Sequence, residues 1–268
     1  MKDLWDDDGA AECGDDLLAL RVYSSRLIGQ SADLVLHGGG NTSVKASFTD
    51  IFGVAHDVLY VKGSGWDLAT IEAGGFAPVK LDSLLQLSRF DRLSDADMVR
   101  AQRAAMLDPS APTPSVEAIL HALIPYRFVD HTHADAVVAL SNTPDGEARI
   151  RSLYGDRMLI VPYVMPGFVL AKKVAELTAG IDWSKLEGMV LMNHGIFSFA
   201  DDAKESYQRM IHFVSQAQDA LGQRPSPLVD GVAVPPLALA TLRREVSRVA
   251  GTAMLARFDG TPASHAFA

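Results

Sequence analysis

The stretch FVDHTHADAVVAL, residues 128–140, joins an apolar, strand-like run to two histidines that stand one residue apart. Because successive side chains of a strand point to opposite faces, His131 and His133 should point the same way from the end of a strand that begins near Arg127. They lie about 6–7 Å apart along such a strand, so both imidazoles can reach one divalent ion where the chain turns. The simpler alternative is that one histidine caps the helix indicated over 134–140 while the other bonds a backbone carbonyl.

Strands and helices alternate on both sides of this stretch. Helical spacing of apolar residues, with start and stop signals, predicts helices over 12–29, 95–106, 112–125, 168–179 and 201–221. Apolar runs predict strands that end at Lys62 and within 156–167, and two strands over 188–200 that meet at Asn193-His194-Gly195. This alternation predicts a layered α/β domain with a central sheet.

The composition is that of a globular protein without a basic surface. The 268 residues are 48% hydrophobic and 21% charged, which is enough to bury a sizeable core in one domain. The net charge of −9 disfavours nucleic acid and anionic membrane surfaces, so we expect neither as a partner. A single cysteine, Cys13, excludes an internal disulfide and a cysteine-rich zinc site. Any metal ligand would therefore be His, Asp or Glu.

The two ends of the chain differ from the middle. The first residues, MKDLWDDDGAAE, are acidic and lack the apolar segment of a signal peptide, so we expect a cytoplasmic protein. Four prolines in GQRPSPLVDGVAVPP, residues 222–236, interrupt the helical pattern. We therefore predict a main domain over 1–222 and an appendage over 223–268, in which 237–249 should be helical and 254–260 strand-like.

His194, between Asn193 and Gly195 where a buried strand should end, is the natural candidate for a third imidazole. Three histidines leave one position of a tetrahedral ion open, which is typical of a catalytic zinc site. The alternative is a turn histidine bonded to the backbone.

Glu117 is the leading candidate for an acid or base, because its neighbours at the predicted helix start carry no charge. A nearby cation would favour its ionised form and burial would oppose it, and such a carboxylate could remove a proton from a substrate. The alternative is a carboxylate that the helix macrodipole stabilises.

Two glycine-rich loops, Gly38-Gly39-Gly40-Asn41 and Lys62-Gly63-Ser64-Gly65, each interpreted as following a strand, offer backbone N–H groups, an amide, a hydroxyl and an ammonium. These are the parts of a phosphate cradle, which Ser115 could join from a helix start. Each loop alone could be a plain tight turn. His37 and His121 are weaker candidates for lining the same pocket.

Five motifs, in this order, resemble the class II aldolase and adducin N-terminal domain family over roughly residues 15–222: GGGNTSV (38–44), KGSG (62–65), PSVEAILH (114–121), HTH (131–133) and NHG (193–195). The resemblance is closest to the aldolase portion of bifunctional rhamnulose-1-phosphate aldolase/alcohol dehydrogenase-like proteins, in which a short-chain dehydrogenase domain follows. This sequence contains no counterpart of that second domain.

The resemblance implies a three-layer α/β/α sandwich with a central mixed, mainly antiparallel sheet, assembled as a C4 homotetramer with sites near the subunit interfaces. It implies Zn²⁺ as the cofactor, with another divalent metal as the alternative, and His131, His133 and His194 as its ligands. It also implies Glu117 as the catalytic base. The residues that it places around a substrate phosphate are Gly40, Asn41, Lys62, Ser64, Gly65 and Ser115.

The resemblance indicates a cytoplasmic lyase of carbohydrate metabolism, which cleaves a rhamnulose-1-phosphate-like ketose 1-phosphate to dihydroxyacetone phosphate and a small aldehyde. The family alternatives are a sugar-phosphate 4-epimerase, a dehydratase and a non-catalytic adducin-like module. Val116 replaces a serine that fuculose-phosphate aldolases have before the glutamate, so either Lys62 compensates or the substrate lacks a phosphate. The resemblance also implies a proton-donating tyrosine from a neighbouring subunit, for which the candidates are Tyr126, Tyr154 and Tyr163.

Overall fold

The computed structural model describes residues 1–222, 234–258 and 261. The chain divides into two compact units, Met1–Leu221 and Gly222–Ala268. The roles predicted for 1–222 as an aldolase-like domain and for 223–268 as an appendage stay predictions.

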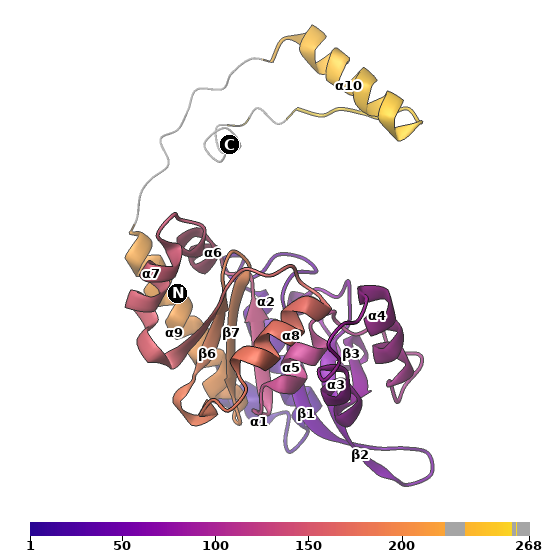
Figure 1. Ribbon diagram of the computed structural model, residues 1–268, viewed down its shortest axis with the longest axis vertical. Coiled ribbons are helices and arrows are strands. Elements are labelled where there is room, and N and C mark those ends of the chain that lie inside the picture. The colour runs from indigo at the N-terminus through magenta and orange to yellow at the C-terminus, as the bar shows by residue number, and fades with distance from the viewer. Residues whose placement is uncertain (223–233, 259–260, 262–268) are drawn as a thin grey trace. The chain divides into compact units, whose positions relative to one another are not determined.

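A seven-stranded sheet forms the centre of the first unit (Figure 1). Its strands are β1 Asn41–Thr49, β2 Ala55–Lys62, β3 Phe76–Lys80, β4 Phe128–Thr132, β5 Met158–Val161, β6 Gly188–Leu191 and β7 Gly195–Ala200. They lie in the order β3-β2-β1-β4-β7-β6-β5. Neighbouring strands are antiparallel except β5 and β6, which are parallel. The predicted mixed, mainly antiparallel sheet is confirmed.

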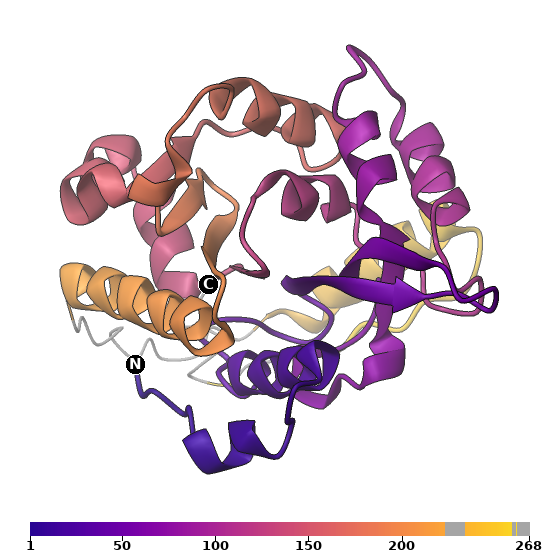
Figure 2. The ribbon, with the colours of Figure 1, turned by 90° about the horizontal axis from the view of Figure 1, so that it is seen from below.

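Helices cover both faces of this sheet. They are α1 Asp7–Ala11, α2 Leu17–Gly29, α3 Leu81–Leu87, α4 Asp95–Ala104, α5 Ala118–Leu123, α6 Asp135–Ser141, α7 Gly146–Tyr154, α8 Phe168–Leu177 and α9 Ala203–Leu221. Short 3₁₀ turns lie at Leu68–Thr70, Ala73–Gly75, Gly155–Arg157 and Trp183–Lys185. Helices α2 and α9 pack together on one face, with α6 and α7 against α9, while α3, α5 and α8 pack in a row on the other. Figure 2 shows these two layers on either side of the strands, so the three-layer sandwich is confirmed.

Side-chain caps explain where several helices begin. The apolar spacing predicts a helix that begins near residue 12. The Asp16 carboxylate accepts hydrogen bonds from Leu18 N and Ala19 N, so α2 begins at Leu17 instead. The Asp202 carboxylate accepts from Glu205 N and marks the start of α9. The helix predicted over 201–221 is therefore confirmed, with Ala203 as its first residue.

A buried ion pair joins β4 to the α2–α9 layer. Asp130 Oδ1 lies 2.7 Å from Arg21 Nη2, and both side chains are almost completely buried. The hydroxyl of Ser206 on α9 donates to the other oxygen of Asp130 at 2.5 Å. Because side chains alternate along a strand, the next residue, His131, points to the opposite face, where α5 lies. One strand thus carries a structural carboxylate on one face and a candidate ligand on the other.

The second unit contains helix α10, Pro236–Ala250, which confirms the helix predicted over 237–249. Residues 254–258 form no strand, because no neighbouring segment among the described residues pairs with them. The strand-like assignment is therefore wrong there, and residues 259–260 lie outside the described residues. Within the described ranges, every helix is too short or too polar to cross a membrane.

The sheet brings distant motifs to one end. The start of β1 is opposite the end of β4, with Asn41 paired to His131. The end of β4 is opposite the start of β7, with Thr132 paired to Ile196. The tight connection between β6 and β7, which pairs Leu191 with Gly195, lies at the same end. Four strand ends thus meet there, and the candidate residues lie on or beside them.

Candidate functional site

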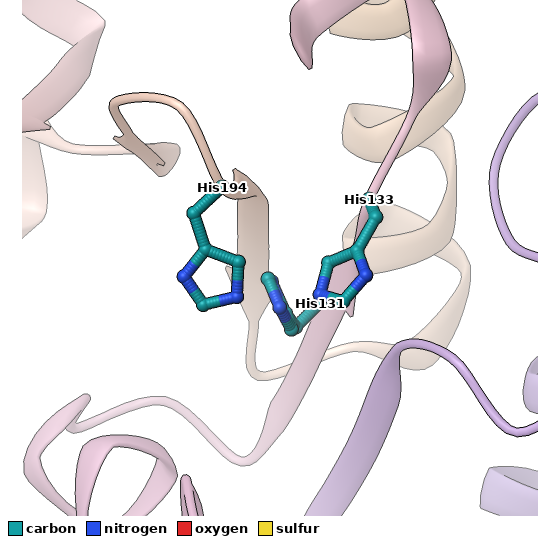
Figure 3. A group of neighbouring side chains, drawn as sticks. All are labelled: His131, His133 and His194. Carbon is teal, nitrogen blue, oxygen red and sulfur yellow. The ribbon is translucent and has the colours of Figure 1, made fainter. Parts of the chain in front are cut away.

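The three histidines predicted as metal ligands lie together. One ligand nitrogen from each of His131, His133 and His194 lies within 4.8 Å of the other two. The ring centroids are 4.9 Å apart for His131 and His133, 5.1 Å for His131 and His194, and 5.0 Å for His133 and His194. Figure 3 shows the three rings around one space, with His131 near the end of β4, His133 just after that strand and His194 on the β6–β7 turn.

His131 is completely buried and its ring orientation is fixed. Its Nδ1 lies 3.1 Å from the carbonyl oxygen of Ile196, so Nδ1–H donates to that oxygen and Nε2 is the unprotonated nitrogen. The ring stacks on Phe197 with centroids 4.2 Å apart. A ligand histidine commonly donates its other ring N–H to a backbone carbonyl in this way.

The β6–β7 turn positions His194. Asn193 has a φ of 60°, a left-handed conformation that is uncommon outside glycine. Its Nδ2 donates to Asn142 Oδ1 at 2.8 Å and its backbone N–H donates to Ser141 Oγ at 3.2 Å, so the end of α6 stabilises the turn. A Cβ at Gly195 would lie 2.4 Å from the carbonyl oxygen of Thr132 and 3.0 Å from a carbon of the His131 ring. Glycine is therefore required after His194.

The three imidazoles are neutral at pH 7. Burial lowers the pKa of His131 well below its usual value, and the neighbouring His194 and His133 add to the effect. Burial also lowers the pKa of His133, with a further contribution from Lys62. The pKa of His194 is lowered by burial, although Glu117 opposes this shift. Neutral imidazole is the form that binds a metal.

Glu117 lies against two of these rings. Its carboxylate oxygens are 3.4 Å from His131 Nε2 and 3.6 Å from His194 Nε2, and its side chain is 6% exposed. Burial raises the pKa of Glu117, while His194, the hydrogen bond from Asn41, and Lys62 act in the opposite direction. Glu117 is the N-cap residue of α5, which begins only at Ala118. The helix predicted over 112–125 is thus shorter than expected.

A chain of buried hydrogen bonds supports Glu117. Asn41 Nδ2 donates to Glu117 Oε2 at 2.6 Å, and Asn41 Oδ1 lies within hydrogen-bond distance of His121 Nε2. His121 Nδ1 lies 2.8 Å from Ser43 Oγ. His121 therefore does not line the pocket as one alternative expected, but is buried behind Asn41. His37 is not among the residues that line the cavity either.

The two glycine-rich loops face each other across the site. The first lies before β1, and residues 34–36, which precede it, are in no strand. The expectation that each loop follows a strand is therefore wrong for this one. Gly40 has a φ of 59°, and a Cβ there would lie 2.8 Å from the carbonyl oxygen of His131. Lys62, at the end of β2, donates to the carbonyl oxygens of Gly38 at 2.8 Å and Gly40 at 3.0 Å. These two hydrogen bonds hold the first loop against Lys62, the first residue of the second loop.

Most of the predicted site residues line one cavity of about 310 Å³. All of them except His131, which lies buried at its edge, line this cavity: Gly40, Asn41, Lys62, Ser64, Gly65, Ser115, Glu117, His133 and His194. Val116 and Pro166 also line it. Pro166 was missed, because a proline in a connecting segment carries no chemical signal in the sequence.

Of the three candidate tyrosines, two are engaged elsewhere. The Tyr126 hydroxyl donates to the carbonyl oxygen of Trp183, and the Tyr154 hydroxyl donates to that of Phe213, each at 2.9 Å. Tyr163 is 54% exposed on the segment that leads to Pro166. Tyr163 is close in sequence to Pro166, which lines the cavity.

The donor set fits a divalent metal ion. Within the part of the chain that the structure describes, His131 Nε2 and Glu117 Oε1 are buried and lack a hydrogen-bond partner. Buried polar atoms without partners are costly, and ligation is one way to satisfy them. Imidazole nitrogens with one carboxylate oxygen suit zinc and related ions.

The model of the class II aldolase and adducin N-terminal domain family matches residues 21–221. A curated relative, an uncharacterized oxidoreductase named YuxG from Bacillus subtilis (strain 168), is 37% identical over 224 residues, which are 84% of this chain and 32% of that protein. This chain thus spans about a third of the length of that relative.

Solved structures show the same fold. The N-terminal class II aldolase domain of a conserved protein from Thermoplasma acidophilum is 40% identical, with a TM-score of 0.75 over 83% of this chain and 100% of that one. A sugar-phosphate aldolase from Thermotoga maritima is 16% identical, with a TM-score of 0.51 over 76% of this chain and 97% of that one. This second likeness concerns the fold alone.

Proposed function

Because this chain belongs to the class II aldolase and adducin N-terminal domain family, we propose that it is a metal-dependent aldehyde-lyase that cleaves a ketose 1-phosphate to dihydroxyacetone phosphate and a small aldehyde. One observation carries the proposal: three imidazole nitrogens within 4.8 Å of one another meet a buried carboxylate beside the cavity of the glycine-rich loops. A rhamnulose-1-phosphate-like sugar is the proposed substrate.

His131, His133 and His194 would hold Zn²⁺ or another divalent metal ion. When bound, such an ion supplies Lewis-acid stabilisation of the negative charge that develops on the enediolate. The neutral state of the three rings and the unpartnered Nε2 of His131 support this assignment.

The glycine-rich loops would bind the phosphate of the substrate. They offer backbone N–H groups, the Ser64 and Ser115 hydroxyls, and the ammonium of Lys62 around one cavity. Burial lowers the pKa of Lys62 to about 8, so the side chain is still mostly cationic at pH 7. A cation held by two loop carbonyls provides charge for the phosphate and keeps the loop in place.

Glu117 would carry the proton. In the cleavage direction the C3–C4 bond breaks and its electron pair stays on C3, while the C4 hydroxyl gives its proton to the Glu117 carboxylate as the aldehyde forms. C3 then gains a proton from Glu117, so the reaction involves no net oxidation or reduction. A carboxyl group whose pKa burial raises is suited to hold and return a proton near neutral pH.

The proposed experiment is a cleavage screen of ketose 1-phosphates beside their unphosphorylated analogues, with added Zn²⁺ or with a chelator. Cleavage of the phosphorylated sugars that stops on chelation and returns with Zn²⁺ is the expected result. Cleavage that ignores chelation would reject the proposed chemistry. Preference for unphosphorylated sugars would mean that Val116 marks a different substrate class.

The same screen separates the alternatives. An epimerase would convert the sugar phosphate without releasing dihydroxyacetone phosphate, and a dehydratase would release water instead. A protein that binds no metal after soaking would favour the adducin-like, non-catalytic alternative. The donor set of His131, His133 and His194 beside Glu117 supports an enzyme, because an interaction module has no physical need for it.

We also propose assembly into a homotetramer, as the family resemblance implies. Exposed apolar side chains lie on segments that border the cavity, including Leu36 at 58%, Met165 at 67% and Val169 at 63%. Apolar side chains that gather around a site are typical of surfaces covered by a partner. The mass of the protein in solution tests this directly, and a monomer would contradict it.

A further inference from the structure

A chain of buried hydrogen bonds connects the proposed base, Glu117, to a serine hydroxyl. It runs from Glu117 through Asn41 and His121 to Ser43. Asn41 is 7% exposed, and His121 and Ser43 are completely buried. His121 lies on α5 one helical turn beyond Glu117 and so points to the same side of that helix.

The chemistry of the four groups fixes the direction of every bond. The Glu117 carboxylate accepts, so the Asn41 atom that faces it at 2.6 Å must be the NH₂ group. The other terminal atom of Asn41 is then its oxygen, which requires a donor from His121 Nε2. Nδ1 of a neutral ring must accept, so Ser43 Oγ–H donates to it.

The surroundings hold the His121 ring in this state. Phe197 meets it edge-on, with centroids 5.3 Å apart, and so limits rotation of the ring. Burial lowers the pKa of His121 well below its usual value, and the nearby cations Lys45 and Arg21 act in the same direction. Lys45 itself donates to the backbone carbonyl of His121, which leaves the ring nitrogens to Asn41 and Ser43.

We propose that His121 is a positioning residue, which holds the Asn41 amide in the one orientation that donates a hydrogen bond to Glu117. The expected effect of His121 on catalysis rests on the proposed aldol cleavage. Its effect on the orientation of the Asn41 amide does not. Without the Nε2–H donor, the Asn41 amide can turn over and place its oxygen against the carboxylate. Glu117 would then lose a hydrogen bond and face a second acceptor.

The first test needs neither metal nor substrate. Nitrogen NMR of the full-length, metal-free protein labelled on histidine reports which ring nitrogen of His121 carries the proton. Protonated Nε2 with unprotonated Nδ1 is expected, and Ser43→Ala should perturb Nδ1. The opposite tautomer, or a ring protonated on both nitrogens near pH 7, would overturn the proposal even if the protein proved to be no aldolase.

The second test is a double-mutant cycle on kcat for aldol cleavage. His121→Phe should lower kcat about 10- to 100-fold with little change in KM, since a hydrogen bond to a charged group is lost. In an Asn41→Ala background the same substitution should change kcat less than about twofold, because the two residues act as one unit. Equal effects in both backgrounds would overturn the proposal.

Two further variants separate positioning from packing. His121→Gln keeps an N–H near the position of Nε2, so it should restore most of the activity that His121→Phe loses. Leu120→Ala removes a buried side chain from the same helix without touching the hydrogen bonds, so it should lower stability and leave kcat unchanged. A His121→Gln variant as impaired as His121→Phe would contradict the role. A wild-type protein without any cleavage activity would instead reject the proposed function and leave the NMR result standing.

Discussion

Replacing Gly195 by alanine should weaken metal binding through the space that one methyl group takes. The added Cβ would lie 2.4 Å from the carbonyl oxygen of Thr132, 1.0 Å short of the 3.4 Å at which ordinary contact begins. It would also lie 3.0 Å from Cε1 of His131 and 3.2 Å from Cδ2 of His133. Strand β7 or the two rings must therefore move by several tenths of an ångström or more.

The size of the effect follows from these distances. Overpacking of this kind costs about 1–3 kcal/mol of folding stability. Displaced ligand rings should lower the affinity for Zn²⁺ about 10- to 100-fold, the loss usual when the support of a metal ligand is disturbed. The affinity is measured by titrating Zn²⁺ against a competing chelator, and stability by denaturant unfolding of the metal-free protein.

Gly188→Ala is the matched control. Its Cβ would lie 2.4 Å from the carbonyl oxygen of Phe197 and 2.7 Å from Met158 Sδ, so it disturbs the same sheet to a similar degree without meeting a histidine ring. Both variants should be destabilised, and only Gly195→Ala should lose metal affinity. Equal affinities in the two variants would refute the reasoning.

Three other predictions concern separate parts of the chain. Glu117→Gln should lower kcat about 10²- to 10⁴-fold, because the amide cannot take up and return the proton. A full rate in the activity assay would remove Glu117 from the mechanism. Lys62 is cationic below its pKa of about 8 and neutral above it. The affinity for sulfate, whose charge is constant, should therefore fall as the pH rises through about 8. A sulfate affinity that does not change with pH would count against Lys62 as part of the anion site. Asp130→Asn should destabilise the fold by about 3–5 kcal/mol in urea unfolding, because Arg21 is left buried and unpaired; a loss below about 1 kcal/mol would contradict the assigned role of this ion pair.

The sequence predicted best what depends on local periodicity. Alternation along a strand was enough to place His131 and His133 together, and the turn residues around His194 located the end of a buried strand. The class of fold followed from the order of strands and helices. It did not require knowledge of which strands are neighbours.

Other features depend on long-range contacts that no short window of sequence contains. The register of Asn41 opposite His131 brings the first glycine-rich loop to the proposed metal ligands, yet 90 residues separate Asn41 from His131. Lys62 was predicted to contact phosphate, but its position is set by two loop carbonyls from the other motif. His121 was undervalued, although its spacing of four from Glu117 on one helix was a usable signal.

The most direct test of the account is a crystal structure of the protein grown with Zn²⁺, with anomalous scattering recorded on both sides of the zinc absorption edge. One strong peak is expected, about 2.0–2.1 Å from a nitrogen of each of His131, His133 and His194, with a further coordination position that no protein atom outside Glu117 occupies. A peak elsewhere, or an ion enclosed by four side chains from other parts of the chain, would contradict the proposed centre.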